Sequence, residues 1–135
     1  MAFIAIVLGI AAPRFNKALE SARLRSDAQQ MASLLKLARQ EAITTSQART
    51  IIFYPNNAKY KINGQSFFSL KEGISFVGTT TFIMQVGGLP ACGFSAAGIP
   101  SSGGTITLQN STDRIYIIVN PVAGRIRISD SPPTE

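Results

Sequence analysis

The segment GRIRIS, near the end of the 135-residue sequence, contains the residues best suited to binding chemistry. If it is a β-strand, alternation of side chains places Arg125 and Arg127 on one face and the two isoleucines on the other. The isoleucine face would pack on a core, while the other face would offer two guanidinium groups, which bind oxyanions such as phosphates well. Gly124 suits the preceding NPVAG turn, which can require a positive φ, and it leaves room for another backbone to approach.

A second pair of cationic residues, Lys59 and Lys61 in AKYKI, shares a strand face in the same way. These lysines are candidates to extend the basic surface of Gly124, Arg125 and Arg127. The simpler interpretation of the two arginines is that they are solvated, or that they protect a sheet edge from pairing with another chain. The residues alone leave both interpretations open.

The composition excludes several kinds of active site. The sequence has no histidine and one cysteine, Cys92, which excludes Cys/His zinc sites, histidine general bases and intrachain disulfides. The seven carboxylates are scattered, and no phosphate-binding loop, dinucleotide fingerprint or GxSxG motif is present. We therefore expect no enzyme activity, metal or cofactor. Cys92 is interpreted as a small buried hydrophobic residue, with a free thiol or an intermolecular disulfide as alternatives.

The charge balance is basic. Thirteen Lys and Arg residues against seven Asp and Glu residues give a formal net charge of +6 and an isoelectric point near 10.0. This net positive charge favours an anionic partner, although a net charge of this size also keeps a small protein soluble. The length is sufficient for one domain with its own core.

The elements that must position these residues begin with twelve uncharged residues, MAFIAIVLGIAA, before Pro13. Twelve residues are too few to cross a bilayer, which takes about 20, and no basic residue precedes them as in a signal peptide. The segment is interpreted as part of a membrane helix that begins before Met1, or as a buried helix of a soluble protein. Its small residues favour helix–helix packing in lipid. The candidate membrane and assembly residues are Phe3, Ile4, Ile6, Val7, Leu8, Ile10 and Pro13.

Beyond Pro13 a helical pattern continues as far as Gln47. Apolar residues recur at steps of three and four, the spacing of one helix face, at Leu24, Ala28, Met31, Leu35, Ala38 and Ala42. Residues 14–27 carry charges of both signs and are expected to be exposed, whereas MASLLKLARQEAI is apolar enough to cover a sheet. Pro13 is expected to kink this helix or to free its backbone locally, and not necessarily to end it.

The rest of the chain has the pattern of short strands. β-branched or aromatic runs are bounded by turn residues; they are RTIIFY, AKYKI, ISFVG, TTFIMQV, GTITL, RIYIIV and GRIRIS. This pattern predicts one or two antiparallel sheets. The Gly- and Pro-rich residues 87–104 are expected to be mostly loop with at most one short strand, and the SDSPPTE tail is expected to fray.

Together these features resemble a type IV pilin-like protein: an apolar start ending in AAPRF, one long helix with a charged middle, and a β domain closing on AGRIRIS. More narrowly, the sequence is similar to the GspH/FimT family of pseudopilins and minor pilins, whose final hairpins and closing Gly-Arg-x-Arg resemble residues 93–129. The resemblance implies an α+β fold, with a long, kinked N-terminal helix packed on an antiparallel β-sheet domain. It divides the chain into an apolar helix segment 1–23 and a globular domain 24–135, with a flexible tail 130–135. The family's leader peptide, its processing and its methylation are not assigned to any residue here.

The resemblance also implies a structural subunit of a type IV pilus-like filament. Such a subunit is a single-pass precursor in the inner membrane with a periplasmic globular domain, and it then joins a pilus or pseudopilus through contacts between N-terminal helices. FimT-like minor pilins are associated with DNA capture in natural transformation, which would make Gly124, Arg125 and Arg127 a weak, non-specific DNA site. One alternative is a filament subunit with no DNA role, either a GspH-like pseudopilin of a type II secretion system or a principal pilin. The other is a soluble adaptor with a buried N-terminal helix.

Overall fold

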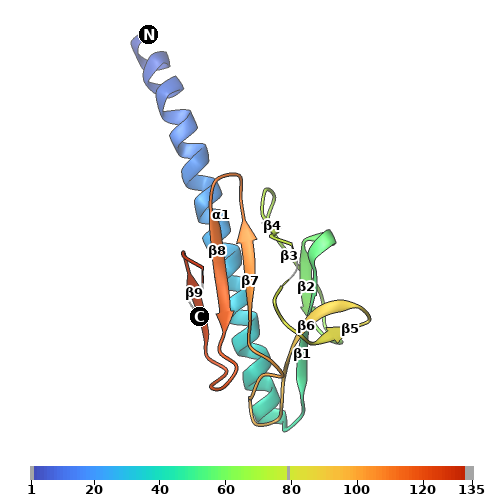
Figure 1. Ribbon diagram of the computed structural model, residues 1–135. Helices are drawn as coiled ribbons and strands as arrows, with labels where there is room; N and C mark the ends of the chain where they lie inside the picture. Colours follow the sequence, from blue (N-terminus) through green and yellow to red (C-terminus); the bar gives the residue numbers. More distant parts are fainter. Residues whose placement is uncertain (1, 79, 133–135) are drawn as a thin grey trace.

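The computed structural model describes residues 2–78 and 80–132, and the side chains of the helix from residue 16 onward. One long helix, α1 (Ala2–Thr45), is followed by strands and a short 3-10 helix, η1 (Pro55–Asn57). The strands are β1 (Arg49–Tyr54), β2 (Lys59–Ile62), β3 (Phe68–Ser69), β4 (Ser75–Phe76), β5 (Gln85–Val86), β6 (Leu89–Phe94), β7 (Gly104–Gln109), β8 (Arg114–Val119) and β9 (Ile126–Ser129). The N-terminal part of α1 projects beyond the strands, while its C-terminal part lies along them (Figure 1).

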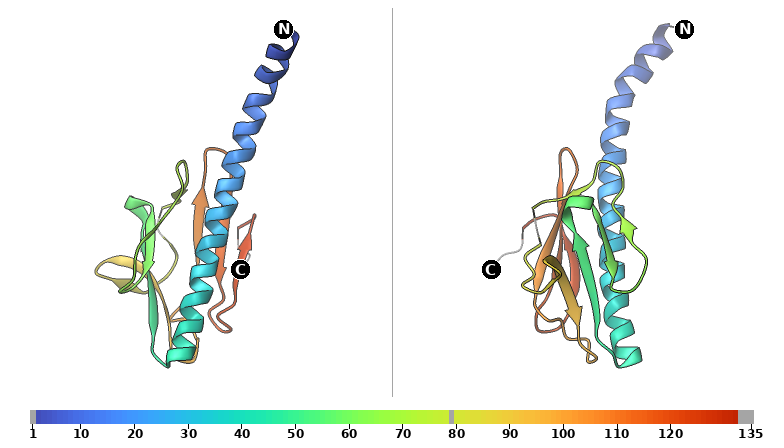
Figure 2. Two further views of the ribbon diagram at one scale, coloured as in Figure 1. Left: turned by 180° about the vertical axis from the view of Figure 1, so that it is seen from behind. Right: turned by 90° about the vertical axis from the view of Figure 1, so that its right-hand side faces the viewer.

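The strands form two antiparallel sheets. One has five strands in the order β3-β2-β1-β6-β5, and the other has four in the order β4-β7-β8-β9. Strands β7, β8 and β9 form a meander in which β9 is an edge strand, with Ile117 opposite Ile128 and Val119 opposite Ile126. Both sheets lie along the same stretch of α1, as the views from behind and from the side show (Figure 2).

The apolar stripe of α1 is the part of the helix that the sheets cover. All six stripe residues predicted from the spacing are buried: Leu24, Ala28, Met31, Leu35, Ala38 and Ala42. Between residues 16 and 23 every side chain is exposed or half-buried, so burial of the described helix begins at Leu24. The predicted α+β fold with a long N-terminal helix is confirmed.

One charged residue of the helix is buried, although the sequence predicted that it would be exposed. Asp27 is only 1% exposed, and its carboxylate accepts hydrogen bonds from the backbone N–H of Lys71 (2.7 Å) and from Lys71 Nζ (3.1 Å). These contacts hold the segment between β3 and β4 against α1, and they pair a charge that would otherwise be costly to bury. Burial, and to a lesser extent the charge of Asp27, raises the pKa of the neighbouring Tyr60 hydroxyl.

Residues 87–104 are mostly loop with one strand, β6, as predicted, but this strand is longer than the short one expected. Strand β6 is six residues long and pairs with both β1 and β5. It lacks the β-branched residues that indicate a strand, and its small residues are used for close packing. At Gly93, for example, an added Cβ would lie 2.9 Å from Sδ of Met84. Conversely, the predicted strands in ISFVG and TTFIMQV form only two ladder residues each, in β4 and β5.

The N-terminal end of the helix is described by its backbone alone. Helix α1 runs through Pro13 without ending. It curves gently toward its N-terminus in the side view, where the sequence had predicted a kink (Figure 2). The side chains of the candidate membrane residues, from Phe3 to Pro13, lie outside the described part. Across the described residues, no helix combines the length and the apolarity that spanning a membrane requires.

We predict that Leu35→Asp unfolds the protein. Leu35 is fully buried in the stripe, and an unpaired buried charge costs several kcal/mol, which is comparable with the whole stability of a small domain, about 5–15 kcal/mol. Leu37→Asp is the matched control, because Leu37 lies on the same helix and is 48% exposed. Thermal melting followed by circular dichroism checks both variants. Equal melting temperatures for wild type and Leu35→Asp would show that the stripe is not the core face.

Candidate anion-binding site

The turn between β8 and β9 is held by one asparagine. The side-chain oxygen of Asn120 accepts hydrogen bonds from the backbone N–H groups of Val122 (2.9 Å) and Ala123 (3.0 Å). Its carbonyl accepts from the N–H of Gly124 (3.0 Å), and its own N–H donates to the carbonyl of Arg125 (2.9 Å). The side chain and backbone of Asn120 thus fix the conformation of the loop that presents the first arginine of GRIR.

Gly124 is required at its position for two reasons, both expected from the sequence. Its φ is +68°, a left-handed conformation that side chains disfavour. An added Cβ would also lie 2.9 Å from the carbonyl oxygen of Gly98 and 3.0 Å from Nε of Arg39. The same Arg39 Nε–H donates a hydrogen bond to that Gly98 carbonyl (3.0 Å). Helix α1, the β6–β7 loop and the β8–β9 turn therefore meet at one carbonyl group.

The alternation predicted for the last strand is present. Ile126 is buried and lies opposite Val119, Arg127 is exposed, and Ile128 is half-buried. Arg125 precedes the strand and is exposed as well. Neither guanidinium takes part in an ion pair in the part of the chain that the structure describes. Two unneutralised cations thus lie on the edge of the four-stranded sheet.

Beside this edge lies a hollow that the sequence analysis did not predict. Its volume is about 610 Å³, and it is lined by Lys36, Arg39 and Gln40 of α1 and by residues 123–126 of the turn and β9. Lys36 is exposed and Arg39 is half-buried. We call this hollow, with its three cations Lys36, Arg39 and Arg125, the basic groove. The only sequence signal for the helical part is that two cations, spaced i and i+3, lie off the apolar stripe.

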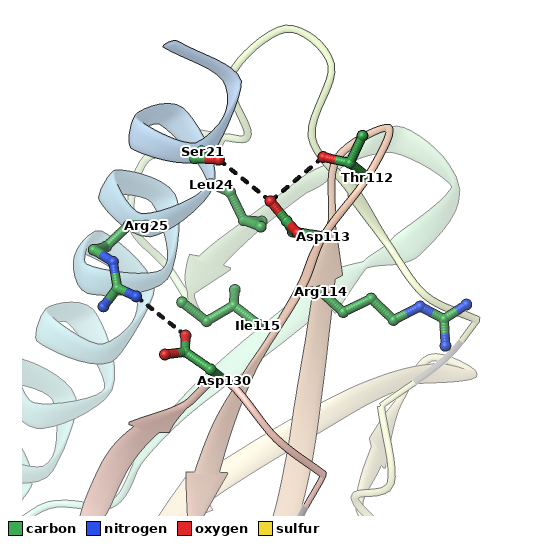
Figure 3. A pocket seen from close by; sticks show the side chains of 8 residues that line it. All are labelled: Ser21, Leu24, Arg25, Thr112, Asp113, Arg114, Ile115 and Asp130. Carbon is green, nitrogen blue, oxygen red and sulfur yellow. Dashed lines mark hydrogen bonds and ion pairs between the residues drawn. The ribbon is translucent and has the colours of Figure 1, made fainter. Parts of the chain in front are cut away.

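A second hollow, of about 400 Å³, differs in its charge (Figure 3). There Arg25 pairs with Asp130 (3.1 Å), and the carboxylate of Asp113 accepts hydrogen bonds from the hydroxyls of Ser21 and Thr112. Arg114 also lines this hollow, with its guanidinium directed away from the helix. Because this hollow contains carboxylates that pair with its own groups, it is a poorer anion site than the basic groove.

Lys59 and Lys61 do not adjoin the basic groove. They lie on β2, an inner strand of the five-stranded sheet, whereas β9 is an edge strand of the other sheet, and the two strands lie apart in the ribbon views (Figures 1 and 2). Their Nζ atoms are 4.1 and 4.7 Å from the ring centre of Phe67, which packs edge-on against Tyr54. The lysines therefore form a separate cluster whose cations already contact aromatic rings.

Cys92 is buried in β6, and burial raises the pKa of its thiol to about 12. At neutral pH the group is therefore a protonated, inert thiol, which agrees with the interpretation of a small buried hydrophobic residue. No cluster of three or more potential metal-ligating residues occurs within residues 2–78 and 80–132.

Comparisons with known proteins agree with this architecture. The sequence profile of the family described as type II transport protein GspH matches residues 27–124. The fold is similar to that of the minor pseudopilin EpsH from the type 2 secretion system of Vibrio cholerae. That match has a TM-score of 0.66 and 13% identity and covers 80% of this chain and 97% of EpsH.

The fold is also similar to that of the type IV minor pilin FimU of Pseudomonas aeruginosa. For one crystal form the TM-score is 0.61 at 15% identity, covering 84% of this chain and 91% of FimU. No curated protein sequence is significantly similar to the chain.

The double requirement at Gly124 predicts a specific loss of stability. Gly124→Ala should lower the free energy of unfolding by about 2–4 kcal/mol, because it adds a steric contact with Gly98 to the strain of a positive φ. Gly64→Ala is the matched control, because Gly64 has φ +86° with nothing within 4 Å of an added Cβ. It should lose only about 1–2 kcal/mol. Urea unfolding measures both, and equal losses would contradict the close approach at Gly124.

Proposed function

The chain belongs to the GspH family, and from this premise we propose that it is a minor subunit of a type IV pilus-like filament and, like FimT-like proteins, binds DNA weakly. The profile match spans most of the globular part, from residue 27 to residue 124. Pilins and pseudopilins of this kind are structural subunits and not enzymes. The chain is accordingly a structural subunit of the pilin and pseudopilin type.

The assembly part of the proposal is supported by the two parts of α1, one packed on the sheets and one projecting beyond them. Leu24 is the first buried residue among the described side chains of α1, and the N-terminal part of the helix extends beyond both sheets (Figure 1). We therefore divide the chain into an assembly segment, residues 1–23, and a globular domain that begins at Leu24. The apolar residues between Phe3 and Pro13 would lie in the inner membrane before assembly and against neighbouring subunits' helices afterwards. Lipid and helices both satisfy such an apolar surface. The globular domain would then be periplasmic.

The DNA part of the proposal is supported by one observation: Arg125 and Arg127 are both exposed on a sheet edge and, among the described residues, neither is paired with a carboxylate. Guanidinium groups in this state bind phosphates without first breaking an internal ion pair. Gly124 fixes the turn that presents them. Phosphate contacts carry no sequence information, so binding would be non-specific. Lys59 and Lys61 would act only as a second, separate contact.

A GspH-like pseudopilin of a type II secretion system is the second candidate. It is favoured by the name of the matching profile and by the likeness to EpsH. In that case the chain would be a filament subunit only, and the two arginines would protect the exposed edge of β9 from pairing with another strand.

The assembly proposal predicts the effect of a truncation. Deleting residues 1–15 should leave a folded, soluble monomer, because the described core contains no residue before Leu24. The full chain should instead partition into membranes or filaments. Size-exclusion chromatography with and without detergent measures the difference. A full chain that is monomeric and soluble without detergent would contradict the filament-subunit proposal.

The DNA proposal predicts a salt-dependent affinity. The full chain should bind duplex DNA with micromolar or weaker affinity at physiological salt. If two to four phosphates are neutralised, the log–log slope against salt should be roughly −2 to −4. The double variant Arg125→Gln, Arg127→Gln should lose most of this binding and keep its melting temperature, because both side chains are exposed.

The matched control is the double variant Lys17→Gln, Arg23→Gln, which removes the same charge from two positions of α1 that precede the buried stripe and lie outside the basic groove. It should bind nearly as tightly as wild type. If the Arg125→Gln, Arg127→Gln variant is folded and its affinity for DNA is unchanged, the DNA proposal fails. The second candidate, a pseudopilin that is a filament subunit only, is then favoured.

A further inference from the structure

We infer that the DNA site is the basic groove and not one strand face, and that Lys36 and Arg39 of α1 contact the same backbone phosphate as Arg125. The inference rests on the proposed function for the identity of the anion. It adds two helical residues, more than 80 positions away from GRIR in the sequence, to a site so far assigned to the end of the chain.

The first support is the shape of the surface. Arg125 lines the basic groove, whereas Arg127 is not among the residues that line it. The volume of about 610 Å³ lies within the range of about 300–1,000 Å³ that is typical of ligand pockets. A phosphate group with its flanking sugars can therefore enter it, with a helix on one side and a turn on the other. A flat strand face would offer no such enclosure.

The second support is the state of Arg39. Its Nε–H donates to the carbonyl of Gly98, which fixes the side chain, and Arg39 is half-buried. A guanidinium carries five N–H donors. The structure records no other hydrogen bond from Arg39 to the described residues, so its Nη groups are free to donate to a phosphate. Because the side chain is already positioned, little rotamer entropy is lost when an anion binds.

The third support is the placement of the carboxylates. Glu41 follows Gln40 directly in the helix, but it pairs with Arg49 (3.6 Å) and accepts a hydrogen bond from Gln65. Asp27 pairs with Lys71, and Asp130 pairs with Arg25. No carboxylate lines the basic groove. Its three cations therefore line one hollow with no carboxylate among its lining residues, and a bound phosphate would offset their charge.

The lysine–aromatic cluster on β2 is less well suited to the same role. The ammonium groups of Lys59 and Lys61 already lie over the ring of Phe67. The basic groove is thus the better site for a backbone phosphate.

Salt-titrated binding of the full chain to a short DNA duplex tests the inference. Lys36→Gln should weaken binding roughly threefold to tenfold and reduce the log–log salt slope by at most about 1, because Arg39 and Arg125 still contact the phosphate. Lys36→Arg should bind like wild type. Lys17→Gln, the same change at an exposed position of the same helix away from the groove, should have little effect. Lys36 is exposed, so melting curves should show every variant folded.

A double-mutant cycle tests whether the residues share a phosphate. The losses caused by Lys36→Gln and Arg125→Gln should be non-additive, since residues that contact one group act as a unit. If Lys36→Gln matches Lys17→Gln while the Arg125, Arg127 double variant loses binding, the groove is overturned and the strand-face site stands. If wild type binds no duplex, the proposed DNA function itself fails. The two failures are therefore distinguishable.

Discussion

One apolar stripe on one helix closes the hydrophobic core of two sheets. Helix α1 contacts β1 and β6 of the five-stranded sheet and β7, β8 and β9 of the four-stranded sheet. Half of the six stripe residues are alanines, namely Ala28, Ala38 and Ala42. Because an alanine side chain is short, strands can approach the helix closely at these positions. Residues of both sheets and of this helix form one hydrophobic core. The buried pair of Asp27 with Lys71 adds a polar contact at one point of the same interface.

The candidate site is a consequence of that packing. Because the stripe fixes the rotation of α1, Lys36 and Arg39 must emerge on the side of the helix where the β8–β9 turn arrives. Gly124 then lets that turn approach closely enough to place Arg125 beside them. The same helix continues outward as the proposed assembly segment (Figure 1). One element thus carries the core, one wall of the basic groove and the contacts proposed for filament assembly.

Much of this could be predicted from the sequence where the signal is local and periodic. The stripe from Leu24 to Ala42 and the alternation around Arg127 depend only on the repeats of a helix and a strand. Prediction from the sequence fails where the secondary structure or the burial of a residue depends on its tertiary neighbours. Strand β6 is stabilised by pairing on both sides although its own residues are poor strand formers. Asp27 is buried because Lys71, far along the chain, satisfies it. Spacing could not place Lys36 next to Arg125, because only the packed helix brings them together.

Native-state hydrogen exchange, resolved by residue, tests most directly whether the helix stripe joins both sheets into one cooperative unit. If it does, the most protected amides of β1, of β8 and of α1 between Leu24 and Ala42 should share one free energy of opening, equal to that of global unfolding. Leu37→Asp should leave that common value nearly unchanged, because Leu37 is exposed. The account would be contradicted if β1 and β8 opened with clearly different free energies. Each sheet would then unfold without the other, and the helix could not be the element on which both depend.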